Sequence, residues 1–311
     1  MAEVFREKIQ GFDCVGLRSN EVEIRILPGL GAKIYSLIDL RTSREWMWAP
    51  TVQRRLFRNA LSDSFLVGPM LGADEMVPTI GACQWRGLSI PGHGEAWREA
   101  WELDMDTLVN GAITTRLRLP VSPLSIERTL TLEGGRVLMR YKLTSHADAP
   151  LEYVWALHPL MTVVAGDELA LPPEVGTVRT DAAFNCDLGA RGASFEWPDP
   201  RPGMHLDKLD FGVKDAAIKF FTGPLVHGWA EIRNQTTGDR IRYSFDIHEL
   251  NTLGIWINRG GLSGYHHTAI EPTNGAPDAL DVAVNDWKRF AVIGPGQART
   301  WTLNIDVGGV A

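Results

Sequence analysis

Apolar residues along this chain recur mainly at every second position or in short β-branched runs. Such runs occupy residues 22–27, 114–119, 126–132, 137–143, 218–221, 241–245 and 300–307. Alternation of this kind places one row of side chains on a buried face of a sheet and the next row on a solvated face. Each run has the length of a strand and is too short for a typical helix. The pattern therefore predicts many short strands.

Turn-forming residues separate these runs. Pro-Gly at 28–29, Glu-Gly-Gly at 133–135, Thr-Gly-Asp at 237–239 and Gly-Pro-Gly at 294–296 lie between apolar segments, as hairpin connections do. Helical periodicity is scarce, and 31 glycines with 18 prolines would interrupt most helices. We expect an all-β fold in which two large antiparallel sheets pack as a sandwich.

Length and composition indicate one large globular unit. Because β-sandwiches of more than about 200 residues can form one domain, we expect a single domain over residues 1–311. Hydrophobic residues make up 44% and charged residues 22%, which supplies both a core and a solvated surface. Residues 65–101 and 172–212 break the strand pattern and are rich in glycine, proline and aromatic residues. Long loops of this kind are often functional.

Charge and hydropathy exclude several classes of partner. A formal net charge of −7, without any tract rich in lysine or arginine, argues against nucleic-acid binding. No stretch approaches the roughly 20 apolar residues of a membrane span, and the first residues lack an apolar export signal. Cys14, Cys83 and Cys186 are isolated and odd in number, which favours a reducing compartment. We expect a cytoplasmic protein that binds neither nucleic acid nor membranes.

The first irregular stretch combines acids, a histidine and aromatic rings. Asp74 and Glu75 precede His93, and Trp97 and Trp101 follow it. Sugars offer hydroxyl edges and apolar C–H faces, so their sites pair carboxylates and imidazoles with aromatic rings. The cluster predicts a sugar site. The alternative is that the tryptophans belong to the core while Asp74 and His93 hold the loop to backbone amides.

Two further ionisable residues end apolar runs. His158 lies near the end of the run at 153–161, where a histidine taken alone is more typical of a satisfied core residue. Glu271 is followed by Pro272, which cannot donate to a central ladder. We therefore expect the strand to end there, with Glu271 at the rim of a pocket where burial would raise its pKa. The alternative is a strand-end carboxylate that pairs with Arg259 or caps a turn.

The run at 253–261 contains two more candidates for contact with a ligand, Trp256 and Arg259. His266 and His267 follow it as a histidine pair that invites a metal interpretation. Adjacent residues on a strand point to opposite faces, so the two imidazoles would not readily share one ion. We expect neither a metal nor a cofactor.

Several segments in this order resemble the aldose 1-epimerase, or galactose mutarotase-like, family, in particular its shorter and more divergent branch. The resemblance spans nearly the whole chain. The matching segments are Gly-Ala-Lys-Ile at 31–34, Asp-Leu-Arg-Thr at 39–42, Glu-Trp at 45–46, Asp-Glu at 74–75, His-Gly-Glu at 93–95, Leu-His-Pro at 157–159, Ile-Glu-Pro at 270–272 with its continuation to Asp278, and the closing Gly-Pro-Gly turn with a final strand.

The resemblance implies a large antiparallel sandwich of the galactose mutarotase-like (supersandwich) type with a sugar in a groove on one sheet. It implies that His158 is the acid, Glu271 the base and His93 a second, substrate-binding histidine, without a cofactor. It also implies an arginine and an aspartate that contact sugar hydroxyls. The candidates for these are Arg54, Arg55, Arg58 and Arg259, and Asp207 and Asp210.

The predicted function is therefore interconversion of the α and β anomers of a free sugar by acid–base ring opening and closing. One alternative is a sugar-binding protein or sensor without catalysis. Another is an enzyme with different chemistry on the same scaffold, such as a lyase or an epimerase for an anionic phospho-, sulfo- or uronic sugar. Arg54, Arg55 and Arg58 would then supply the arginine fork that recognises the anionic group.

Overall fold

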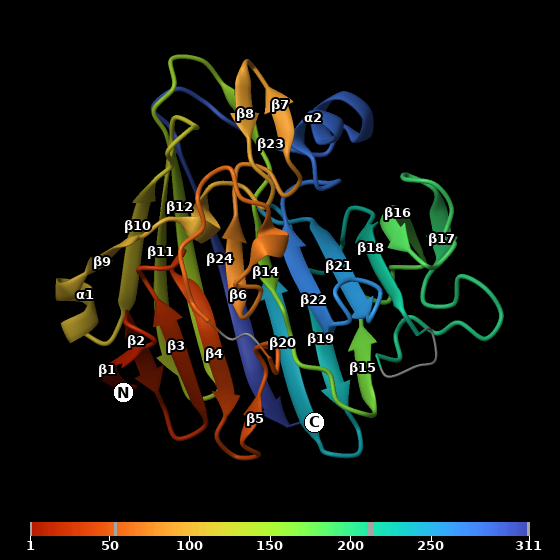
Figure 1. The fold of residues 1–311 in the computed structure, drawn as a ribbon, viewed down its shortest axis with the longest axis horizontal. Helices are drawn as coiled ribbons and strands as arrows, with labels where there is room; N and C mark the ends of the chain where they lie inside the picture. The colour runs from red at the N-terminus through yellow and green to blue at the C-terminus, as the bar shows by residue number, and fades with distance from the viewer. Residues whose placement is uncertain (1, 53–54, 210–213, 310–311) are drawn as a thin grey trace.

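The computed structural model describes residues 2–52, 55–209 and 214–309. Wherever two of its named strands are hydrogen-bonded neighbours, they run antiparallel. A 12-stranded sheet and an 8-stranded sheet stack on each other, as Figure 1 shows. Two short two-stranded ribbons complete the strands of the described residues. The expected all-β fold with two large antiparallel sheets is confirmed.

The large sheet has the order β1-β2-β3-β4-β6-β14-β22-β21-β18-β16-β17, with β5 paired to β4. Its strands are β1 (Glu3–Ile9), β2 (Phe12–Arg18), β3 (Val22–Leu27), β4 (Lys33–Asp39), β5 (Arg44–Glu45), β6 (Ala73–Met76), β14 (Ala156–Pro159), β22 (His266–Thr273), β21 (Thr252–Arg259), β18 (Ala216–Thr222), β16 (Thr177–Phe184) and β17 (Ser194–Glu196).

The smaller sheet has the order β15-β19-β20-β24-β12-β11-β10-β9. Its strands are β15 (Asp167–Ala170), β19 (Trp229–Asn234), β20 (Asp239–Phe245), β24 (Ala298–Gly309), β12 (Arg136–Ser145), β11 (Leu124–Glu133), β10 (Ile113–Arg118) and β9 (Glu102–Asp104). The ribbons are β7 (Cys83–Trp85) with β8 (Leu88–Ile90), and β13 (Leu151–Tyr153) with β23 (Ala291–Ile293). The helical turns are α1 (Met105–Val109), α2 (Leu280–Val282), η1 (Phe65–Val67), η2 (Ala96–Arg98) and η3 (Ala283–Trp287).

The alternating runs form strands as expected. The run at 22–27 coincides with β3, and the run at 126–132 lies inside β11, whose residues alternate between buried and half-buried. The apolar rows of both sheets meet in one shared core that includes Ile24, Leu130 and Leu303. Burying such rows is the main favourable term in folding, at about 25 cal/mol per Å² of apolar surface. The alternation of apolar and polar residues therefore determines which face of each sheet packs against the other sheet.

Three expectations about connections are corrected. The turn at 294–296 is not a hairpin, because β23 pairs with β13 whereas β24 pairs with β12 and β20. The two irregular stretches are also more than loops, since β6 lies in the first and β16 in the second. Both strands contain a buried aspartate, Asp74 in β6 and Asp181 in β16, which interrupts the apolar pattern that would have marked them.

A buried carboxylate links the two sheets. Glu75 on β6 is fully buried and accepts hydrogen bonds from Arg128 Nη1, the Tyr141 hydroxyl and Trp155 Nε1, each at 2.9 Å. Arg128 and Tyr141 belong to β11 and β12 of the smaller sheet. Arg128 also donates to the carbonyl of Ala32. A buried charge is tolerated only when it is paired and hydrogen-bonded in this way, so β6 has a fixed position relative to the smaller sheet.

Cys14, Cys83 and Cys186 are free thiols, and burial raises the pKa of Cys14 to about 12. Among the residues that the structure describes, no helix has both the length and the apolar character needed to cross a bilayer.

The Glu75 network leads to a stability prediction. Glu75→Ala should lower the free energy of unfolding by about 3–5 kcal/mol, because the Arg128 guanidinium would remain buried without its counter-charge. Glu127→Ala is the control, since Glu127 pairs with Arg116 at the surface, where such pairs contribute about 0–1 kcal/mol. Urea unfolding followed by tryptophan fluorescence measures both values. Equal losses in the two variants would contradict this role of Glu75.

Candidate active site

His158 and Glu271 lie on neighbouring strands that separate between two points of pairing. β14 pairs with β22 at Ala156 and Thr273, and the chain pairs again at Met161 and Thr268. Counting inward from both points brings His158 opposite Glu271. Because they are register neighbours on one face, their side chains point in the same direction. Two residues 113 positions apart in the chain therefore meet in the interval where the ladder is interrupted.

Prolines explain why the ladder is interrupted in this interval. Pro159 follows His158 on β14, and Pro272 follows Glu271 on β22. Proline has no backbone N–H, so it cannot contribute a donor to a continuous ladder. The dipeptides His-Pro and Glu-Pro each place an ionisable side chain beside such a missing donor. The His-Pro and Glu-Pro dipeptides therefore both interrupt the hydrogen bonds between the two strands and place the two ionisable side chains at the interruption.

The expectation that Glu271 lies at a strand end is corrected by the same geometry. β22 continues to Thr273, and β21 and β14 flank it near the middle of the large sheet. Glu271 is 0% exposed, so its carboxylate is in the interior and not at a rim. Its ionic partner is Lys219 and not Arg259. Burial raises the pKa of Glu271, and Lys219 acts in the opposite direction.

The two side chains are close and otherwise sparsely bonded. His158 Nε2 is 3.6 Å from Glu271 Oε1. Neither Glu271 Oε1 nor His158 Nδ1 has a hydrogen-bond partner among the described residues. Burial lowers the pKa of His158 well below its ordinary value, and His93 and Lys219 lower it further. The imidazole is therefore neutral at neutral pH, and both residues retain free hydrogen-bonding capacity.

A cavity of about 380 Å³ opens above this pair. Sites for small molecules commonly have volumes of about 300–1,000 Å³ and combine apolar walls with a few polar groups. Leu160, Met70 and Phe65 supply apolar wall, while His158 and Glu271 supply polar groups. A single sugar ring matches both the size and the mixed character of this cavity.

Two of the other predicted residues line the cavity. His93 stacks on Phe65 with ring centroids 3.7 Å apart, and its ring is 5.2 Å from that of His158 in an edge-on arrangement. Burial lowers the pKa of His93 to about 3, with Lys219 adding to the effect. Trp256 lines the cavity from β21 and donates its Nε1–H to His267 Nε2 at 3.0 Å.

Three predicted residues lie outside the cavity, which corrects their assignment as substrate contacts. Asp74 is buried against the ammonium of Lys33, and Glu75 serves the network between the sheets. Arg259 interacts with the carbonyl of Lys208 at the end of β21. These residues are close in sequence to residues of the cavity, but sequence position alone did not show on which face of the strand each side chain lies.

The remaining arginine and aspartate candidates are also absent from the cavity wall. Arg55 and Arg58 are exposed, and Asp207 lies beside Lys208. Arg54 and Asp210 lie outside the described residues. Trp97 and Trp101 are core residues, 1% and 4% exposed, so the alternative considered for them is the one observed.

Four charged residues of the cavity were not identified as site residues from the sequence. Lys219 contacts Glu271, and Asp278 Oδ1 is 3.5 Å from the Lys219 ammonium. Arg191 Nε donates to Asp181 Oδ1 at 2.7 Å. A β-bulge between Thr180 and Ala182 leaves Asp181 without a register partner, and bulges of this kind commonly turn a side chain toward a site. Only the Pro-Asp ending of the 270–278 motif gave a signal for Asp278.

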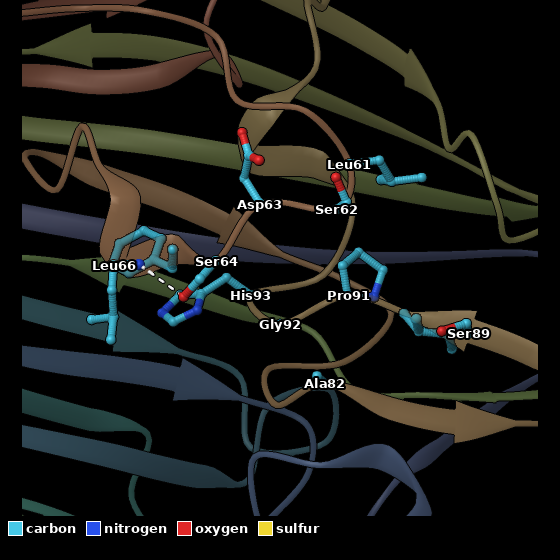
Figure 2. Close-up of a pocket in the computed structure, with 12 residues that line it drawn as sticks. Leu61, Ser62, Asp63, Ser64, Leu66, Ala82, Ser89, Pro91, Gly92 and His93 are labelled. Carbon is cyan, nitrogen blue, oxygen red and sulfur yellow. Dashed lines mark hydrogen bonds between the residues drawn. The ribbon is translucent and has the colours of Figure 1, made fainter.

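A second hollow lies beside the first, on the other side of the wall formed by Phe65 and His93. Figure 2 shows it between residues 61–66 and 89–93, with the Leu66 N–H donating to Ser64 Oγ at 3.2 Å. His93, Phe65 and Leu66 line both hollows. The segment that contains η1 is therefore the partition between the site and this outer surface.

Histidines and carboxylates line the cavity, but no three of those described have ligand atoms close enough together to hold an ion. His266 is exposed while His267 is buried, so the two imidazoles face apart. Within the described chain, the only three side chains with ligand atoms close enough to hold an ion are Asp199, His205 and Asp207, and none of them lines the cavity. The geometry of the site is that of acid–base groups around an apolar hollow.

The structure is similar to several solved structures along its whole length. A galactose mutarotase-like protein from Clostridium acetobutylicum has a TM-score of 0.72 and 12% identity, with 99% of each chain covered. A galactose mutarotase-like protein from Lactobacillus casei has a TM-score of 0.66 and 16% identity, covering 95% of this chain and all of the other. A protein provisionally named an aldose 1-epimerase, from Escherichia coli K12, has a TM-score of 0.71 and 12% identity over both full chains.

The chain has the galactose mutarotase-like fold. This confirms the resemblance seen in the sequence at the level of the fold. No family model matches the sequence, and no curated protein matches it either. In this mutarotase-like fold the cavity lies on the large sheet, at strands β14, β22, β21, β18 and β16.

His267 leads to a prediction about pH. Burial lowers its pKa to about 3, so the unfolded chain binds a proton below pH 6.5 that the folded chain rejects. The free energy of unfolding therefore decreases as the pH falls from about 6.5 toward 3, because the proton binds only to His267 of the unfolded chain. His267→Gln should reduce the loss of unfolding free energy between pH 7.5 and pH 5 by about 2 kcal/mol. Urea unfolding of both proteins at the two pH values measures this difference, and parallel losses would contradict it.

Proposed function

We propose that this protein is a cofactor-independent aldose 1-epimerase that interconverts the anomers of a free sugar. The observation that supports this most directly is the pairing of His158 with Glu271, 3.6 Å apart, at a cavity of monosaccharide size. The anomeric oxygen and the ring oxygen of a sugar are bonded to the same carbon. Groups that exchange protons with both oxygens must therefore be neighbours, as these two side chains are.

In the proposed reaction, the Glu271 carboxylate takes the proton of the anomeric hydroxyl while His158 donates one to the ring oxygen. The bond between the anomeric carbon and the ring oxygen breaks, and a free aldehyde forms. Rotation about the adjacent carbon–carbon bond presents the other face of the carbonyl. Reclosure with the two proton transfers reversed returns both residues to their starting state and yields the opposite anomer.

This cycle requires one titratable proton that resides either on the carboxyl group of Glu271 or on the imidazole of His158, which it converts to the imidazolium. With the proton on His158, Glu271 is the base and His158 is the acid. Burial of the two groups favours the opposite arrangement, because it raises the pKa of Glu271 and lowers that of His158. A further charge near Glu271 must therefore contribute to the active state.

We propose an uncharged sugar as the substrate. Both cations on the described cavity wall already have carboxylate partners, since Lys219 contacts Glu271 and Arg191 donates to Asp181. A phosphate, sulfonate or uronic carboxylate would need a free guanidinium or ammonium. Arg55 and Arg58, which were considered for this purpose, do not line the cavity.

Exchange NMR of anomer interconversion tests the proposal. D-Glucose and D-galactose represent uncharged sugars, and D-glucose 6-phosphate and D-glucuronate represent anionic ones. We expect faster exchange for at least one uncharged sugar with wild-type protein. His158→Ala and Glu271→Gln should each reduce this acceleration by about 10²–10⁴-fold, as expected for removal of a general acid or base.

Matched controls are available on the surface. His227 and Glu249 are exposed, so His227→Ala and Glu249→Gln should retain wild-type exchange rates. Circular dichroism establishes that each variant is folded. Wild-type rates in folded His158→Ala and Glu271→Gln would remove the pair from the mechanism. Saturable sugar binding without any acceleration by the wild-type protein would instead favour a binding protein or sensor.

A further inference from the structure

Lys219 is a buried cation at the cavity whose purpose the acid–base pair alone does not explain. Its side chain is 6% exposed, and its ammonium contacts Glu271 Oε2. Asp278 Oδ1 is 3.5 Å away on its other side. Burial opposes the charged form of Lys219, but Asp278 and Glu271 outweigh burial and raise the pKa of the ammonium. The lysine is therefore a permanent positive charge between two carboxyl groups.

The contact between Lys219 and Glu271 passes over an intervening strand. Lys219 is on β18 and Glu271 on β22, with β21 between them. The β21 residue opposite Glu271 is Gly254. A Cβ atom at this position would be 3.1 Å from Glu271 Oε2 and 3.3 Å from Lys219 Nζ. Glycine leaves room for this close approach, and a side chain at position 254 would crowd both charged groups and the Phe221 ring.

The two carboxylate oxygens of Glu271 have different surroundings as a result. Oε2 is engaged by Lys219, whereas Oε1 has no hydrogen-bond partner among the described residues and is 3.6 Å from His158 Nε2. A carboxylate held by one oxygen cannot rotate freely, so the other oxygen stays directed at the imidazole. The adjacent positive charge also stabilises the ionised form of Glu271 against the penalty of burial.

We propose that Lys219 is a positioning residue that holds Glu271 as an ionised base with Oε1 directed at the reacting sugar. This inference rests on the proposed function, because it assigns Glu271 the role of base. Among the described residues, Lys219 is bonded to Oε2 of Glu271 and not to Oε1, which is the oxygen nearest His158. It acts through direct contact with Glu271, whose ionised form it stabilises, whereas it lowers the pKa of His158 only from a distance.

Other charged groups around this unit affect the same balance. Asp181 on β16 raises the pKa of Glu271, and Arg191 is bonded to Asp181. Burial raises the pKa of Asp278 to about 7, so its charge beside Lys219 changes near neutral pH. His93 and His267 are neutral there because burial lowers the pKa of each to about 3. Among the described groups facing Glu271, Lys219 is the cation in direct contact.

Lys219→Met tests the proposal through the pH dependence of kcat/KM for the uncharged hexose that exchanges fastest. Activity requires the carboxylate, so it is present above the pKa of Glu271 and lost below it. Removing the ammonium raises that pKa, and the acid limb of the profile should move to higher pH by about 1 unit or more. Lys219→Arg, which retains a cation, should restore the limb toward the wild-type position.

A direct readout separates this inference from the proposed function. Side-chain ¹³C NMR of labelled protein, with Glu271→Gln used for assignment, reports the titration of Glu271 without any substrate. We expect Glu271 to titrate at higher pH in Lys219→Met than in wild type. Absence of mutarotation in wild-type protein would overturn the proposed function, whereas an unchanged Glu271 titration in Lys219→Met would overturn the role of Lys219.

Two further variants keep the test decisive. Gly254→Ala inserts a methyl group between the two charges, so it should shift Glu271 in the same direction but by less than Lys219→Met. It replaces Lys219→Met as the deciding variant if that protein does not fold. Lys208→Met removes a lysine that pairs with Glu168 at the surface, and both the limb and the titration should stay at their wild-type positions. An equal shift in Lys208→Met would also overturn the proposal.

Discussion

Glu75 is a negative charge in the interior between two sheets, and the position of β6 depends on its bonds. Arg128 and Tyr141 reach it from the smaller sheet, and Trp155 reaches it from just before β14. The next residue back, Asp74, is in register with His158 on β14. The bonds of Glu75 thus determine where β6 lies, and β6 determines where His158 lies. A residue that binds no ligand in this arrangement still sets the geometry of the site.

The site and its surroundings contain three ion pairs in which the carboxylate is buried. Lys33 is paired with Asp74 beneath the strands, Lys219 with Glu271, and Arg191 with Asp181. Isolated charges in such surroundings would shift their pKa values until they became neutral. Pairing with Lys33 and Lys219 opposes the effect of burial on Asp74 and Glu271, and the histidines of the cavity are the neutral groups. The chemistry proposed for His158 and Glu271 therefore depends on cations that lie one or two strands away.

Strand periodicity is a local signal, so the strand at 22–27 could be predicted from the sequence. The pair His158 and Glu271 came from the family resemblance, because a histidine in an apolar run is by itself typical of a core and the Glu-Pro dipeptide predicted a strand end that the structure does not have. Asp74 and Glu75 were harder, since adjacent residues in a strand face opposite ways and neither side could be assigned to a ligand without the partner strands. Asp181 could not be anticipated, because a bulge places it, and a bulge depends on the pairing of β16 with β18. Lys219 has no motif, and only the register over Gly254 shows its contact.

The interval between the two pairing points of β14 and β22 restricts how the chain can vary. His158 and Glu271 face the same way only because the spans 156–161 and 268–273 have matched lengths between their anchors. A single inserted or deleted residue in either span would rotate everything beyond it to the opposite side of the sheet. Such a change would place one of the two side chains on the opposite face of the sheet from the other. Substitutions in these spans can adjust the site, but a change of length would abolish it.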